Sequence, residues 1–71
     1  MYREALQDRL RQIDREVAEG ERQLAEQEAR VHELKRAGED TTAAEAQLEN
    51  LRSEQRRRDQ DRQRLLSQLQ P

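Results

Sequence analysis

The sequence has no cysteine, a single proline at its last position and a single aromatic residue, Tyr2. The lack of cysteine excludes disulfides, which many small folds use as staples. The lack of aromatics removes the stacking platforms on which single-stranded nucleic acids bind. No apolar run exceeds two residues, whereas a membrane-spanning helix needs about 20. The sequence therefore predicts no transmembrane helix.

The N-terminus also lacks an apolar segment, because Arg3 and Glu4 bring charge into its first residues. A secretory signal needs an apolar stretch of at least about seven residues. We therefore expect no signal peptide and a cytoplasmic location by default. The absence of cysteine agrees with that compartment.

Apolar residues are scarce, at 31% of 71 residues, and eight of them are alanines that bury little surface. A chain this short and polar does not stabilise itself comfortably, and without disulfides we expect oligomerisation to support it. Ala, Glu, Lys, Leu and Arg make up 42 of the 71 residues, and the net charge is only −2. This composition favours long helices or coiled coil over disorder.

Apolar residues recur at alternating steps of four and three, which defines a heptad repeat and predicts a coiled coil. In the first half, the a positions are Arg3, Leu10, Val17, Leu24 and Val31, and the d positions are Leu6, Ile13, Gly20, Gln27 and Leu34. In the second half, they are Thr41, Leu48, Gln55, Arg62 and Leu69 at a, and Ala44, Leu51, Arg58 and Leu65 at d.

A turn is expected between the halves. Gly38 suits the left-handed end of a helix. Thr42 and Glu45 have the capping-box spacing, with Asp40 and Thr41 as rival N-caps. We predict one all-α unit over residues 1–71, an antiparallel two-helix coiled-coil hairpin with helices over about 3–37 and 42–69 and a turn at 38–41. One continuous rod is the alternative, since a lone glycine costs a helix only about 1 kcal/mol.

Charge pairs flanking the seam favour one of two neighbouring registers. We name each after the sum of the residue numbers in a facing core pair. The 82 register makes three favourable pairs and one repulsive pair, whereas the 75 register makes one favourable pair and three acidic clashes. We therefore expect the 82 register, by roughly 1 kcal/mol. Its favourable pairs are Lys35 with Glu45, Glu28 with Arg52, and Arg30 with Glu54.

The 82 register sets Gln27 against Gln55 and Gly20 against Arg62. The two amides either hydrogen-bond across the seam or turn to solvent. Leu6 and Leu10 would overhang the second helix, and such exposed apolar surface predicts a docking site. We expect dimerisation to complete a four-helix bundle, with a marginal monomer as the alternative. The predicted protein-interaction residues are Leu6, Leu10, Ile13, Val17, Leu65, Leu66 and Leu69.

Catalytic and ligand-binding motifs are missing, and a two-helix rod offers no concavity for a small molecule. His32, the only histidine, falls at an outward b position, and Ala29 stands where a Glu-x-x-His metal pair needs glutamate. We therefore expect no enzyme, cofactor, metal or small-molecule ligand. The predicted function is a non-enzymatic protein-interaction module or small adaptor that self-associates.

Nucleic-acid binding is the alternative that the arginine-rich segment 52–64 raises, with a local charge of +3. The chain is net acidic and lacks aromatic platforms, so we regard this function as the weaker one. Its candidate residues are Arg52, Arg56, Arg57, Arg62 and Arg64.

The stretch from Arg15 to Leu51 resembles a group of short helical-hairpin proteins common in alphaproteobacteria. The matching features are Gly20-Glu21-Arg22, Gly38 with Asp40-Thr41, and the closing segment from Arg62 to Leu66. The resemblance implies a bacterial cytoplasmic hairpin and no particular activity. The chain departs from the group at Glu39, where histidine is frequent, and at the basic segment 55–58.

In length and in its mid-chain turn, the chain is also similar to the small hairpin co-chaperones of type III secretion needles. That likeness implies a helical partner protein bound along an apolar face, here Leu6, Leu10 and Ile13.

Overall fold

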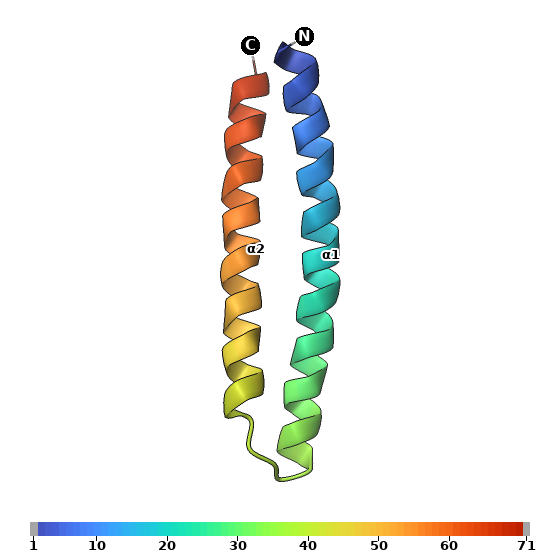
Figure 1. Cartoon of the computed structure of the whole chain (residues 1–71), viewed down its shortest axis with the longest axis vertical. Helices are drawn as coiled ribbons and strands as arrows, with labels where there is room; N and C mark the ends of the chain where they lie inside the picture. Colours follow the sequence, from blue (N-terminus) through green and yellow to red (C-terminus); the bar gives the residue numbers. More distant parts are fainter. Residues whose placement is uncertain (1, 71) are drawn as a thin grey trace.

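Two antiparallel helices make up the structure (Figure 1). The computed structural model describes residues 2–70, in which α1 spans Tyr2–Arg36 and α2 spans Thr42–Leu69. The helices lie side by side along their length, so that the start of α1 and the end of α2 meet at the same end of the hairpin. The predicted hairpin is confirmed, and the continuous rod is wrong.

Gly38 ends α1 in the way that the sequence predicts. Its φ angle is 72°, in the left-handed region. The Glu39 amide donates to the Leu34 carbonyl at 2.9 Å, and the Gly38 amide donates to the Lys35 carbonyl at 3.1 Å. These two bonds form a Schellman motif, which satisfies carbonyls that the helix end would otherwise leave free.

Thr41, one of the predicted N-caps, holds the N-cap position of α2 but makes no side-chain capping hydrogen bond. Asp40 supplies the acceptor, in place of the predicted capping box of Thr42 and Glu45. The Thr42 amide and hydroxyl both donate to Asp40 Oδ1, at 3.0 and 2.8 Å. The hydrogen bond from the Thr42 amide lowers the pKa of the Asp40 carboxyl most, and the hydrogen bond from the Thr42 hydroxyl lowers it further. Glu45 instead pairs with Lys35 across the turn, at 3.3 Å between Nζ and Oε1. Its carboxylate is therefore not used as a cap.

The helices pack in the 75 register, and the predicted 82 register is wrong. Gln55 lies against Gly20, where a methyl group would come within 2.9 Å of the Gln55 Cδ atom. Near the turn, Val31 packs in one cluster with Ala44 and Leu48. In this register Gly20 faces Gln55 and not Arg62.

The predicted overhang of α1 is also wrong. The Tyr2 hydroxyl donates to Gln68 Oε1 at 3.4 Å, so the first turn of α1 lies beside the last turn of α2. The 75 register puts Leu6 in the layer of Leu69 and Leu10 in the layer of Leu65, and all four side chains are half-buried.

Burial outweighs the charge preference that favoured the other register. Fully burying one leucine contributes about 1.5 to 3 kcal/mol, so even partial cover of Leu6 and Leu10 exceeds a preference of about 1 kcal/mol. The ion pairs between the helices also differ from those that the sequence predicts. Asp14 does not meet an acidic neighbour but pairs with Arg62, at 2.6 Å from Oδ1 to Nε. Of the three predicted cross-helix pairs, only Lys35 with Glu45 is found among residues 2–70.

The heptad repeat is confirmed by burial. Every a and d position from Leu6 to Leu69 is buried or half-buried. The most complete core lies at the turn end, where Leu24 and Leu34 flank the cluster of Val31, Ala44 and Leu48.

We predict that Gly38→Ala destabilises the hairpin by about 1 kcal/mol, because an L side chain is strained at positive φ. No neighbouring atom lies near the new methyl group, so the effect comes from the backbone alone. Urea unfolding followed by circular dichroism measures it. Gly38→Asn is the matched control and should cost only a few tenths of a kcal/mol, because asparagine tolerates this conformation. An equal loss in both variants would contradict the prediction.

Asp40 should make stability depend on pH. Its pKa is lower in the folded state, so its contribution is complete above the unfolded value of about 3.9 and is lost as pH falls through the folded value. We expect the stability difference between wild type and Asp40→Ala in urea unfolding to shrink from pH 7 to about pH 2. Glu39→Ala, which removes the neighbouring carboxylate but not the cap, is the control. A difference that stays constant with pH would oppose this assignment.

Candidate functional site

The candidate site is the end of the hairpin where the two helix termini meet, which we call the open end (Figure 1). The 75 register gathers all seven predicted interaction residues in this half of the molecule. Ile13 is 2% exposed and lies inside the seam, where no outside partner reaches it. The others are half-buried: Leu6, Leu10, Val17, Leu65, Leu66 and Leu69.

The two ends of the seam differ in how completely they bury their apolar side chains. At the turn end, Val31 and Leu48 are both 7% exposed, and the half-buried Leu24 and Leu34 pack against them. At the open end, five leucines remain half-buried, and we call Leu6, Leu10, Leu65, Leu66 and Leu69 the open-end leucines. Two helices alone therefore leave this end of the core incomplete.

The two flanks of the seam differ in charge at the open end. Beside the middle layers stand Glu21, Glu28 and Arg52. Beside the last layers, Gln7 and Leu66 stand on one side, whereas Arg9 lies with Asp61 and Arg64 on the other. Leu66 lies outside the a and d positions, and Tyr2 is 74% exposed. Leu66 therefore extends the apolar surface outward from the seam on one side of the open end.

The off-seam alanines do not form a second face. They are exposed and occupy b, c and f positions, which point to different sides of the helices. They therefore give no continuous contact surface along the hairpin. These residues are Ala18, Ala25, Ala29, Ala43 and Ala46.

The polar middle of the seam is satisfied by backbone contacts. Gln55 is 8% exposed, and its Nε2 donates to the Val17 carbonyl of α1 at 2.8 Å. Its Oε1 accepts from Arg58 Nη1 at 3.2 Å. Gln27 Nε2 donates to the Ala44 carbonyl of α2 at 2.9 Å. Each amide thus binds the backbone of the facing helix, and the predicted alternatives, a bond between the amides or escape to solvent, are both wrong.

Sequence reasoning missed the contact between Gln55 and Gly20. A glycine at a d position removes the side chain that normally fills the layer, so a long amide from the facing helix reaches the backbone there. The glycine at a d position is visible in the sequence, but the residue that faces it can be named only once the register is known.

The predicted nucleic-acid residues are mostly engaged with carboxylates. Glu49 accepts from Arg56 at 3.2 Å and lies 3.8 Å from Arg52. Arg62 pairs with Asp14, as described above, and Arg64 lies 3.4 Å from Asp61. Arg57 is exposed and makes no ion pair with the described residues. These carboxylates compete with phosphate for the arginines.

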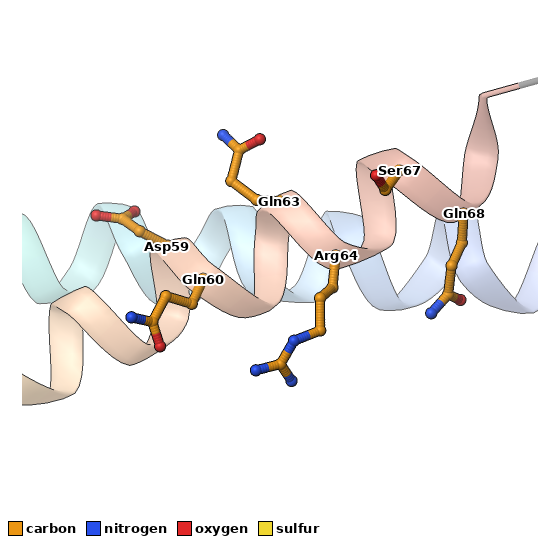
Figure 2. A pocket seen from close by; sticks show the side chains of 6 residues that line it. All are labelled: Asp59, Gln60, Gln63, Arg64, Ser67 and Gln68. Atoms are coloured by element: carbon orange, nitrogen blue, oxygen red, sulfur yellow. The ribbon is translucent and has the colours of Figure 1, made fainter.

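A shallow surface on α2 offers no enclosed site (Figure 2). The six residues that line it all come from one helix, and their side chains spread to opposite sides of it. They share no common centre where a ligand would be surrounded. These residues are Asp59, Gln60, Gln63, Arg64, Ser67 and Gln68.

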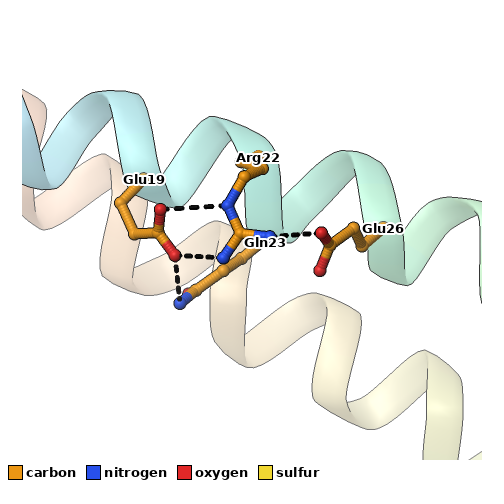
Figure 3. A network of polar contacts seen from close by, with 4 residues as sticks. All are labelled: Glu19, Arg22, Gln23 and Glu26. Carbon is orange, nitrogen blue, oxygen red and sulfur yellow. Dashed lines mark hydrogen bonds and ion pairs between the residues drawn. The ribbon is translucent and has the colours of Figure 1, made fainter.

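A polar network on the outer face of α1 joins Arg22 to Glu19 and Glu26 (Figure 3). Arg22 Nε donates to Glu19 Oε2 at 3.0 Å, and this hydrogen bond lowers the pKa of Glu19. All of these side chains are exposed or half-exposed and lie three or four residues apart, a spacing that supports a helix locally. Among residues 2–70, no three His, Asp or Glu side chains gather as metal ligands would.

The chain was compared with family models, curated proteins and solved structures. None of them matches it. The resemblance to alphaproteobacterial hairpins therefore stays a prediction. Neither helix between residues 2 and 70 is long and apolar enough to cross a membrane.

We predict that the protein does not shift a labelled 20-base-pair DNA duplex at about 50 mM salt, because most of the candidate arginines are paired. An electrophoretic mobility assay at protein concentrations up to about 10 µM tests this. A shift that disappears in Arg57→Gln and weakens steeply with salt would instead support nucleic-acid binding.

Proposed function

We propose that this protein is a non-enzymatic protein-interaction module that self-associates through the open end of its hairpin. The observation that carries the proposal is the group of five half-buried open-end leucines, of which Leu66 lies outside the seam, while the buried cluster of Val31, Ala44 and Leu48 lies at the turn end. Gln7 borders Leu66 on one flank of the seam, whereas Arg9 lies with Asp61 and Arg64 on the other. Another apolar surface would therefore cover less charge on the Leu66 flank.

The exposed area supports a partner. The hairpin exposes 5510 Å². A compact monomer of 8.5 kDa exposes about 4,700 Å². The excess is roughly 800 Å², the area that each partner of a standard-size interface buries. A dimer would thus bring the exposed surface per chain to the value of an ordinary small protein.

A second copy is the occupant that fits this surface best. The open end presents Leu66 and the edges of the other open-end leucines without a net excess of either charge, so it is complementary to itself. A twofold axis through the patch would bring four helices together there and close the assembly. Along the middle of the hairpin, the residues that flank the seam are charged, so we expect the contact between the two copies to be limited to the open end.

Leu66→Glu should weaken self-association about 100-fold, because each of two symmetry-related leucines would lose its apolar contact. Leu66 lies outside the seam, so the hairpin should keep its helicity by circular dichroism. Ser67→Glu places the same charge one residue further on an exposed side and is the matched control. Sedimentation equilibrium over a hundredfold concentration range measures the assembly.

The wild type should sediment as a dimer whose melting temperature rises with concentration. Equal dissociation of both variants would place the contact elsewhere. A wild type that is monomeric at every concentration would overturn self-association, and the open end would then serve a different helical protein, as in the co-chaperone alternative.

A further inference from the structure

The heptad repeat in both helices permits two registers. Sliding one helix by seven residues returns every a and d residue to the seam. The 75 register contains four fully apolar layers: Leu6 with Leu69, Leu10 with Leu65, Leu24 with Leu51, and Val31 with Ala44. The 82 register also contains four: Ile13 with Leu69, Val17 with Leu65, Val31 with Leu51, and Leu34 with Leu48. The number of fully apolar layers is therefore the same in the two registers, although the 82 register leaves Leu6 and Leu10 without facing residues.

The amide contacts in the middle of the seam exist only in the 75 register. Gln55 fills the space left by Gly20 and binds the Val17 carbonyl, while Gln27 binds the Ala44 carbonyl. A slide of one heptad is about 10 Å, so it breaks both hydrogen bonds. It also sets Gly20 against Arg62 and leaves the Gly20 space without its amide.

Charges act in both directions. The 75 register sets Glu28 near Glu45, whereas the 82 register brings Glu28 to Arg52. The observed register also forms the cross-helix ion pairs of Lys35 with Glu45 and of Asp14 with Arg62. Electrostatics therefore does not by itself choose between the registers, and salt weakens both effects.

The turn contains the parts for either register. Gly38 adopts a left-handed conformation here, but glycine also fits a helix interior, so α1 can extend through it. Asp40 caps α2 in the observed register. Thr42 and Glu45 keep an unused capping-box spacing for a later start of α2.

We infer that the contact of Gln55 with Gly20 is a register lock, and that a slide to the 82 register opens Leu6 and Leu10 for a second copy. In the 82 register Leu65 and Leu69 turn to Val17 and Ile13, which uncovers the two leucines of α1. This inference rests on the proposed function, because it describes how the open end is regulated. A partner that binds the freed leucines shifts the population toward the 82 register.

Two engineered disulfides report the register separately, because the chain has no cysteine of its own. The cysteines of the Leu10→Cys, Leu65→Cys variant face each other in the 75 register. Those of the Val17→Cys, Leu65→Cys variant face each other in the 82 register. A disulfide needs Cα atoms within about 7 Å, so each pair is bridged in its own register only. Oxidation at about 1 µM, followed by mass analysis, counts intramolecular bridges in the monomer.

Gln55→Ala removes the lock, and Gly20→Ala displaces it by filling its space. Both should raise the ratio of the 82 bridge to the 75 bridge about fivefold, the effect of about one hydrogen bond. Gln60→Ala, on the exposed side of α2, is the matched control and should leave the ratio unchanged. Gly20→Ala also raises helix propensity, so it keeps the measurement valid if Gln55→Ala loses helicity.

A bridge ratio that is the same in Gly20→Ala, Gln55→Ala and Gln60→Ala would overturn the lock. Sedimentation of the same three variants, without the cysteines, tests the link to association. If the ratio rises but the dimer does not strengthen, the lock exists and does not regulate the open end. A wild type that never dimerises, with a ratio that still responds to the variants, would sink the proposed function and leave the register lock standing.

Discussion

The packing of the Gln55 amide into the space beside Gly20 is the constraint on which the rest of the structure depends. It binds the α1 backbone at the Val17 carbonyl and fixes which residues of the two helices face each other. From that register follow the layers of Leu6 with Leu69 and Leu10 with Leu65, and the alignment of the two helix ends (Figure 1). A one-heptad slide would keep the helices and change nearly every contact between them.

The core between the helices is apolar and buried at the turn end, polar in the middle, and only half-buried at the open end. The polar middle is tolerated because Gln27 and Gln55 each donate a hydrogen bond to a backbone carbonyl of the facing helix. Among the described residues, no buried side-chain nitrogen or oxygen lacks a hydrogen-bond partner. The turn end closes over Val31, Ala44 and Leu48. The open-end leucines are less fully covered, so a second chain would bury additional apolar surface at this end.

The charges contribute little to the choice of fold, although they make up 42% of the residues. Most of the ion pairs lie within one helix, as in the network of Arg22, and the side chains are largely exposed (Figure 3). Such pairs are worth well under 1 kcal/mol each, and arginines reach more than one carboxylate. Asp14 with Arg62 shows why fixed pairing rules fail, since Arg62 stands at an a position, which a rule that pairs only the flanking residues leaves out.

The sequence by itself determined the two helices, their heptad positions, and the turn at Gly38, because helical periodicity and left-handed glycine are local properties of the chain. It also named the residues that gather at the open end. The tertiary structure alone decided the register, since both registers satisfy the same repeat and the count of charge pairs separates them by only about 1 kcal/mol. The observed register covers Leu6 and Leu10 and fits the Gln55 amide beside Gly20, and these contacts join residues at least 35 positions apart that no local pattern pairs.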